Sequence, residues 1–257
     1  MSAKEVKVRG IVVREAPMGD KDKRVILLTE EMGKISVLAK GALGPKSKQA
    51  ALTQLFSVVE LVLTKGRTFY YIKEGRLLES FYDLRLSLEK VSYASLMAEV
   101  ADTLCLDGQE NRTLLRLLYR ALKAQIRQEE GKESLPCDVF ILRALSDNGF
   151  YPELSTCEIC HRVLLNDEDL KADESVQFDV RNGGIICPSC RRGGLTLSRG
   201  TLKAMRYIVS SPYETLFKFT VEPFVLKELD TAAREYLKEQ TERKYQGLEF
   251  LKEISKA

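Results

Sequence analysis

The chain has a single histidine, His161, and this scarcity narrows the chemistry open to it. A Ser-His-Asp or Cys-His centre needs an imidazole base, and the one imidazole lies directly beside a cysteine motif. The sequence also has no H-E-x-x-H motif, no dinucleotide fingerprint and no carboxylate cluster suited to two-metal chemistry. We therefore expect a protein that is not an enzyme.

Long apolar runs are also missing. No run approaches the roughly 20 residues that a membrane span needs, and residues 1–10 lack the apolar region of a secretory signal. We expect a cytoplasmic protein with no membrane contact. Because disulfides are uncommon in that compartment, the six cysteines are read as metal ligands, catalytic thiols or buried apolar side chains.

Composition and charge indicate a globular protein with a basic N-terminal part. A length of 257 residues, 44% hydrophobic and 30% charged, fits one large domain or two to three small ones. Residues 1–80 hold 15 Lys and Arg against 9 Asp and Glu, whereas residues 81–257 hold 25 against 28. A polyanionic partner would therefore meet the N-terminal segment.

Hydrophobic periodicity divides the chain into an α+β arrangement. Five segments between residues 5 and 79 alternate as strands do and are separated by turn residues, which predicts a small β-barrel. Helical spacing follows over 84–106, 111–128 and 136–148, with Asn111 as an N-cap and Gly149 after the third helix, and it returns over 198–209 and 223–240. The predicted segments are a barrel over 1–80, helices over 81–154, a cysteine module over 155–195 and helices over 196–257.

Four cysteines form two C-x-x-C motifs separated by 26 residues. Cys157 and Cys160 form the first pair, and Cys187 and Cys190 form the second. Two such turns can supply the four sulfurs of a tetrahedral zinc site, and the alternation from Val176 to Ile186 predicts a hairpin that delivers the second pair. A closed four-sulfur shell has no open position, so we expect one structural zinc ion.

Other readings of these cysteines remain open at this stage. Residues 157–161 match the C-x-x-C-H haem-attachment pattern, although covalent haem attachment normally requires export. Either pair alone could be a redox dithiol, and His161 could replace a cysteine as ligand. Cys105 and Cys137 lie in helical patterns and are expected to be buried.

Cations and aromatic rings are interleaved in the barrel segment, as in proteins that bind single-stranded nucleic acid. Residues 41–47 contain glycines like a phosphate loop, but Pro45 stands between Gly44 and Lys46, which favours a basic loop over a nucleotide site. Phe69, Tyr70 and Tyr71 are consecutive, so at least one ring should face the core. The candidate nucleic-acid contacts are Arg14, Lys21, Lys23, Arg24, Lys34, Lys40, Lys46, Lys48, Lys65 and Arg67.

The second predicted helix carries a cationic stripe. Its five basic residues fall within about 80° of arc at about 100° per residue, opposite a leucine-rich face and without acids on the same side. The stripe is either a solvated surface or a docking site for an acidic peptide or a phosphate. Its members are Arg112, Arg116, Arg120, Lys123 and Arg127.

Over nearly its whole length the chain resembles the bacterial RecO recombination mediators. The resemblance rests on the segment from Lys7 to Lys48, on LLESFYDLR (residues 77–85) and on the late C-x-x-C pair with C-P-S-C after NGG. It implies an N-terminal OB-fold barrel followed by a helical domain with a zinc-ribbon-like insert, and no catalysis of bond cleavage. Some members lack the complete cysteine set, so a metal would brace the fold.

The resemblance also implies a function in DNA repair and homologous recombination. Members are expected to bind single- and double-stranded DNA, to anneal complementary strands, and to help RecR load RecA onto strands covered by single-stranded DNA-binding protein (SSB), near the nucleoid. The acidic tail of SSB is expected to dock on the helical domain, where we assign Arg112, Arg116 and Arg120. The alternatives are a zinc-ribbon adaptor for RNA or transcription and, less favoured, a metal-dependent nuclease.

Overall fold

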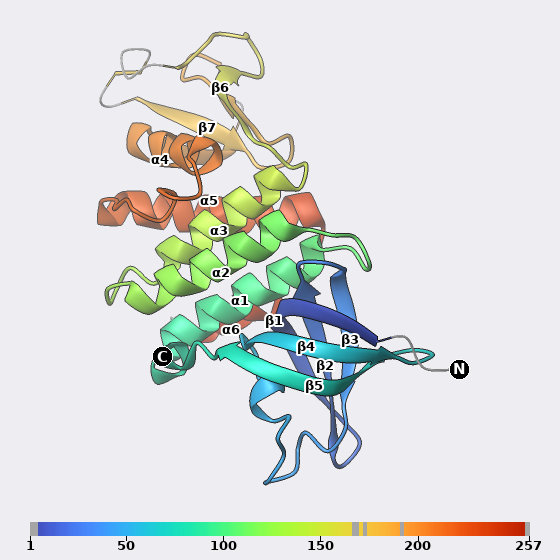
Figure 1. Ribbon diagram of the computed structural model, residues 1–257. Helices are drawn as coiled ribbons and strands as arrows, with labels where there is room; N and C mark the ends of the chain where they lie inside the picture. The colour runs from blue at the N-terminus through green and yellow to red at the C-terminus, as the bar shows by residue number, and fades with distance from the viewer. Residues whose placement is uncertain (1–4, 166–169, 172–173, 191–192, 255–257) are drawn as a thin grey trace. The chain divides into compact units, whose positions relative to one another are not determined.

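The computed structural model describes residues 5–165, 170–171, 174–190 and 193–254, which divide into two compact units at residues 126/127 (Figure 1). The first unit contains β1 (Glu5–Met18), β2 (Asp22–Thr29), β3 (Gly33–Ala39), η1 (Ala51–Thr53), β4 (Val58–Lys65), β5 (Tyr70–Glu79), η2 (Tyr82–Leu86), α1 (Leu88–Leu104) and α2 (Arg112–Arg127). The second contains α3 (Ser134–Asp147), β6 (Glu153–Cys157), β7 (Ser175–Asp179), β8 (Gly184–Ile186), β9 (Leu195–Ser198), α4 (Arg199–Ser210), α5 (Pro223–Thr241) and α6 (Gln246–Ile254). The four segments predicted from the sequence stay a prediction. The two units are defined by how compactly their residues pack, and this does not separate a barrel, helices and a cysteine module.

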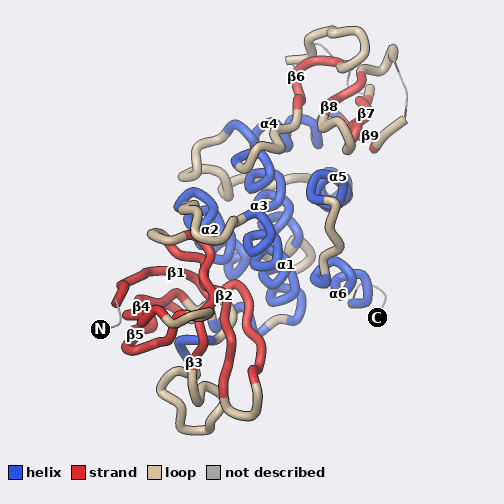
Figure 2. The backbone as a smooth tube through the Cα atoms, turned by 90° about the vertical axis from the view of Figure 1, so that its right-hand side faces the viewer, coloured by secondary structure: helices blue, strands red, loops and turns tan. Residues whose placement is uncertain are grey.

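The five N-terminal strands form a barrel in the order β1-β2-β3-β5-β4, with β4 returning to β1 (Figure 2). Most neighbours are antiparallel, whereas β3 and β5 meet in parallel over only two residue pairs, Val37 with Tyr70 and Leu38 with Tyr71. This short seam is where the barrel closes. The strand order matches the OB-type barrel that the resemblance implies, and the α+β class is confirmed.

Alternation along the strands fills the barrel interior with branched aliphatic side chains. Val8 and Val12 of β1, with Leu27 of β2, belong to a core cluster of buried residues, and the partly buried Tyr70 packs against it. Gly10 lets two strands approach closely, because a Cβ there would lie 2.3 Å from the carbonyl oxygen of Leu28. The prediction that one of the three consecutive rings faces the core is confirmed for Tyr70.

The helices of the first unit begin at capping residues. The hydroxyl of Ser87 accepts a hydrogen bond from the Lys90 N–H at 3.2 Å, so α1 starts at Leu88. The predicted start at Leu84 was wrong, because residues 82–86 form the separate 3-10 helix η2. The predicted cap of α2 is confirmed, since the Asn111 side chain accepts from the Leu114 N–H at 3.0 Å.

The second unit is built around α3, which is buried along most of its length and packs against α4 and α5. Gly149 has a φ of +99° and ends α3 as predicted, and the Phe150 N–H donates to the Leu145 carbonyl at 3.0 Å. Strands in the order β6-β8-β7-β9 form a sheet that contacts α4 and α5. The predicted hairpin is confirmed as β7 and β8, whereas α6 was not predicted.

A fully buried carboxyl on α3 lies near a partly buried carboxyl on α5. Asp138 is fully buried on α3, and burial followed by the nearby Asp230 raises its pKa well above the usual value. Arg234 opposes this effect through its 2.6 Å ion pair with Asp230, whose own pKa is also raised by burial. A carboxyl whose folded-state pKa is raised stabilises the fold at low pH and loses that contribution as the pH rises through the folded-state pKa.

Replacing Asp138 with Asn should therefore flatten the pH dependence of stability. The amide keeps the size of the side chain but cannot ionise, so the variant should lose less unfolding free energy than the parent between pH 5 and pH 8. Urea unfolding at the two pH values measures this difference. Glu235→Gln, which alters an exposed carboxylate of α5, is the control and should keep the parent's pH dependence. If the unfolding free energy of Asp138→Asn changed with pH as much as that of the parent, the raised pKa of Asp138 would be contradicted.

Candidate nucleic-acid interface and metal centre

One end of the barrel gathers basic side chains from β2, from β4 and from the loops after β1, β3 and β4. The Leu43 N–H donates to the Lys21 carbonyl at 3.0 Å, and the Gly41 N–H donates to Asp22 Oδ1 at 2.8 Å, so the end of β3 meets the β1–β2 loop. The start of β5 pairs with the end of β3, which brings the β4–β5 loop to the same place. We call this surface the cationic barrel end; its basic residues are Lys21, Lys23, Arg24, Lys40, Lys65 and Arg67.

Two aromatic rings lie under cations on the cationic barrel end. The guanidinium of Arg24 is 5.5 Å from the centre of the Phe69 ring, and the ammonium of Lys40 is 5.1 Å from that of Tyr71. Both rings are half-buried, and both cations are exposed. The Arg24 Nε also donates to Ser36 Oγ at 2.9 Å, which fixes the guanidinium over β3. Ring faces beside fixed cations form a platform on which a base can stack while its phosphate is neutralised.

Acidic residues compensate part of the cationic barrel end. Lys23 pairs with Glu15 at 2.6 Å, and Asp22 is engaged by the backbone of Gly41, whereas Asp20 is exposed. Lys21, Lys65 and Arg67 are exposed. The candidates Lys46 and Lys48 are also exposed and lie in the loop between β3 and β4. The surface therefore keeps an excess of positive charge.

Two further candidates, Arg14 and Lys34, are held by the same carboxylate. Asp102 of α1 lies 3.3 Å from Arg14 and 3.2 Å from Lys34, and its backbone carbonyl accepts from Lys34 Nζ at 2.7 Å. These contacts attach β1 and β3 to α1. Lys34 is only 21% exposed, so the structure places it in an internal ion pair, away from the cationic barrel end.

The stripe on α2 is present, and acids outside the helix pair with some of its cations. Arg112, Arg116 and Arg120 are exposed, and the leucines on the opposite face are buried. Arg112 pairs with Glu110 at 2.6 Å, and Lys123 pairs with Glu79 of β5. The prediction that this face of the helix carries no acid of its own is confirmed, because α2 contains no Asp or Glu. The acid Glu79 comes from β5, which is distant in sequence and reaches Lys123 only through the fold.

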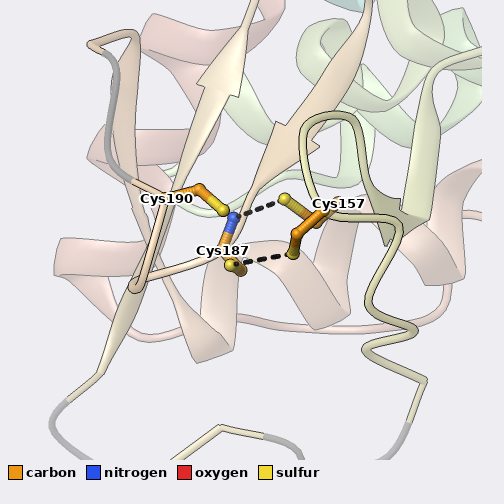
Figure 3. Close-up of side chains that lie close together, drawn as sticks. Cys157, Cys187 and Cys190 are labelled. Atoms are coloured by element: carbon orange, nitrogen blue, oxygen red, sulfur yellow. Dashed lines mark hydrogen bonds between the residues drawn. The ribbon is translucent and has the colours of Figure 1, made fainter.

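The four motif cysteines converge at the ends of two adjacent strands. Cys157 ends β6, and Cys187 follows β8, which pairs in parallel with β6. Each motif turns sharply, since the His161 N–H donates to the Cys157 carbonyl at 2.9 Å and the Cys190 N–H donates to the Cys187 carbonyl at 3.0 Å. Figure 3 shows that the side chains of Cys157, Cys187 and Cys190 lie close together.

The sulfur geometry fits a tetrahedral metal site. All four Sγ atoms lie within 4.8 Å of one another, and Cys160 and Cys187 are 3.7 Å apart. Zinc–sulfur bonds of about 2.3 Å place the sulfurs of a regular tetrahedron about 3.8 Å apart. The Cys187 N–H donates to Cys157 Sγ at 3.3 Å, a contact that would stabilise a metal-bound thiolate. His161 is exposed and does not belong to the group.

The pKa values of these thiols reflect the closeness of the four sulfurs. Burial alone would raise the pKa of Cys157, but backbone N–H donors of Cys160, Cys187 and Ile159 outweigh it and lower the pKa to about 6. Hydrogen bonds shared with the Cys160 and Cys187 sulfurs raise the pKa of Cys190 to about 12. A divalent cation removes this conflict by stabilising all four thiolates together. The four cysteines can therefore hold one metal ion, which would have a structural role.

Arg206 of α4 supports the first cysteine turn, a role that no sequence pattern indicated. Its guanidinium donates to the Leu154 carbonyl at 2.9 and 2.7 Å and to the Leu165 carbonyl at 3.3 Å, on either side of Cys157 and Cys160. The carbonyls are contributed by residues 41 or more positions away, so no local pattern could have revealed them. Cys105 and Cys137 are buried as predicted, and burial raises the pKa of each thiol.

Loss of one sulfur should abolish stoichiometric metal binding. Because four thiolates complete the shell, Cys187→Ser should reduce bound zinc from one equivalent to well below half, measured by elemental analysis of the purified protein. Chelation of the parent protein should lower its thermal stability for the same reason. Cys137→Ala is the control and should keep one equivalent; full zinc content in Cys187→Ser would show that the cluster is not the metal site.

These features define a class of protein: an OB-type barrel with a cationic, aromatic end, joined in one chain to a helical unit with a four-cysteine site. Family models for "Recombination protein O N terminal" and "Recombination protein O C terminal" match residues 1–81 and 85–249. Together the two models cover almost the whole chain. The chain belongs to the RecO family of DNA repair and recombination proteins.

Full-length relatives agree with the family models. The chain is similar to a DNA repair protein RecO of Acetivibrio thermocellus, with 34% identity over 254 residues and 98% of each chain covered. It is 33% identical over 253 residues to one of Symbiobacterium thermophilum, covering 97% of this chain and 98% of the relative. Among the described residues, no helix has both the length and the apolar composition needed to cross a lipid bilayer.

Proposed function

We propose that this protein is a non-enzymatic recombination mediator that binds single- and double-stranded DNA through the cationic barrel end. The observation that carries the proposal is the pairing of Arg24 with Phe69 and of Lys40 with Tyr71 on one surface. The cations neutralise phosphates, and the rings offer stacking faces that every base can use. Membership in the RecO family supports a DNA ligand over the RNA of a zinc-ribbon adaptor.

Annealing follows from this kind of binding. Two complementary strands repel each other, and a surface that neutralises phosphates without reading base edges lowers that repulsion while leaving the bases free to pair. The cationic barrel end combines an excess of basic side chains with aromatic rings, which suits contacts with any sequence. We propose that the protein acts in the cytoplasm, at the nucleoid, where it cooperates with RecR to load RecA onto SSB-covered strands.

Salt dependence separates the cations of this surface from its rings. Arg24→Gln and Lys40→Gln should each reduce the log–log salt slope of single-strand binding by about 0.7, because each removes one phosphate contact. Tyr71→Leu should instead weaken binding at every salt concentration, by roughly 5- to 150-fold, with little change in slope, because stacking is not ionic. Fluorescence anisotropy with an oligonucleotide over a salt series measures both quantities.

The matched control is Lys7→Gln, which removes an exposed lysine of β1 that is paired with Glu60 at 3.3 Å. It should leave the slope at the parental value. Equal slopes in Arg24→Gln, Lys40→Gln and Lys7→Gln would contradict the assigned surface. Failure of the parent protein to accelerate pairing of complementary DNA strands would contradict the mediator function itself, since an RNA adaptor has no reason to accelerate it.

We assign the α2 stripe to the acidic tail of SSB. Arg112, Arg116 and Arg120 are exposed along one face of a helix whose other face is buried, so a peptide could reach all three. Reversal of all three charges, as Arg112→Glu, Arg116→Glu and Arg120→Glu together, should weaken binding of a tail peptide at least tenfold by calorimetry. Arg76→Glu, an exposed barrel arginine, is the control, and unchanged peptide affinity in the triple variant would exclude this stripe.

A further inference from the structure

The four cysteines of the site differ in their exposure to solvent. Cys157 and Cys187 are fully buried, Cys190 is half-buried and Cys160 is exposed. Oxidants reach a cysteine site through its most accessible sulfur, and susceptibility follows exposure and thiolate character. In a metal-bound site all four sulfurs are thiolates, so exposure decides which of them reacts first. That sulfur is Cys160.

We propose that Cys160 is a site of oxidation by hydrogen peroxide, and that its oxidation forms a disulfide with Cys187 and releases the metal. The two Sγ atoms are 3.7 Å apart and belong to different C-x-x-C motifs. The bond would therefore join the turn after β6 to the turn after β8. It would hold the two strand ends together after the metal has left.

The reaction balances with peroxide as the only oxidant. The Cys160 thiolate attacks one peroxide oxygen and the O–O bond breaks, which gives a sulfenic acid and hydroxide. The Cys187 thiolate then attacks the Cys160 sulfur and expels a second hydroxide, and both hydroxides take protons from water or buffer. The two sulfurs lose two electrons and peroxide gains them. A zinc ion that has lost two of its four ligands dissociates.

Hydrogen bonding favours Cys187 over Cys157 as the sulfur that attacks. The Cys157 sulfur accepts the backbone N–H of Cys187 at 3.3 Å, which holds that sulfur in place. The Cys187 sulfur lies 3.7 Å from the Cys160 sulfur, close enough to attack it. Attack by Cys157 would give a disulfide within one motif, whereas attack by Cys187 gives one between motifs. The identity of the disulfide therefore tests the proposal directly.

The experiment uses the full-length zinc-loaded protein and contains its own internal controls. Peroxide is added in increasing amounts, released zinc is followed with a colorimetric chelator, and free thiols are alkylated before peptide mass mapping without reduction. We expect one zinc released per Cys160–Cys187 disulfide, with Cys105 and Cys137 still alkylated after unfolding because both are buried. Dithiothreitol and added zinc should restore the site.

Two variants separate disulfide formation from simple loss of a ligand. Cys160→His keeps a metal-binding side chain but cannot form the disulfide, and should retain zinc at peroxide doses that empty the parent. Cys190→His makes the same change in the other motif and should release zinc as the parent does. Zinc retained by the parent, or a disulfide that joins Cys160 to Cys157 or Cys190, would overturn the proposal. If a variant binds no zinc, the disulfide identified by mass mapping of the parent protein is the deciding result.

Discussion

The barrel depends on the requirement that every second side chain of its strands face a dry interior. Val8, Val12 and Leu27 satisfy this requirement in β1 and β2, so the residue on either side of each faces the outside of the barrel. The same alternation separates neighbours on β5, where Tyr70 packs against the core while Tyr71 lies beside Lys40. A surface with cations over rings is therefore a consequence of core packing combined with the register between β3 and β5. Shifting that register by one residue would bury Tyr71 and expose Tyr70.

Local patterns were sufficient to predict the features that depend on near neighbours. The strand alternation, the Asn111 cap, the Gly149 helix end and the two C-x-x-C turns each involve residues within a few positions, and the structure confirms them. The start of α1 was misplaced because residues 82–86 have helical spacing but form a 3-10 turn before the Ser87 cap. The short helix α6, with two buried leucines, offered too little periodic signal.

Charge compensation could not be predicted, because it depends on contacts between distant segments. Asp102 reaches Lys34 across 68 positions and Arg14 across a still longer separation, and it converts two candidate DNA contacts into a link between the barrel and α1. Glu79 similarly reaches Lys123 across 44 positions. A sequence gives the number of cations in a segment, but only the fold shows which of them are already neutralised. By this criterion the ion pairs of Arg14, Lys23 and Lys34 count against three of the ten candidates for DNA contact. The exposed members of the cationic barrel end are favoured: Lys21, Arg24, Lys40, Lys65 and Arg67.

The proposed DNA surface and the four-cysteine site differ in the solvent exposure that they require. A surface for DNA works through exposed charges, because the release of counterions from phosphates supplies the affinity, and rings need only one open face. A four-sulfur metal site works through enclosure, because its thiolates are stabilised by a cation and by N–H donors such as that of Cys187. Cys160 is the exception within its own site, because it is exposed although such a site is stabilised by burial of its sulfurs. The oxidation proposed for Cys160 follows from that exception, and it requires no change in the barrel, whose described residues include no cysteine.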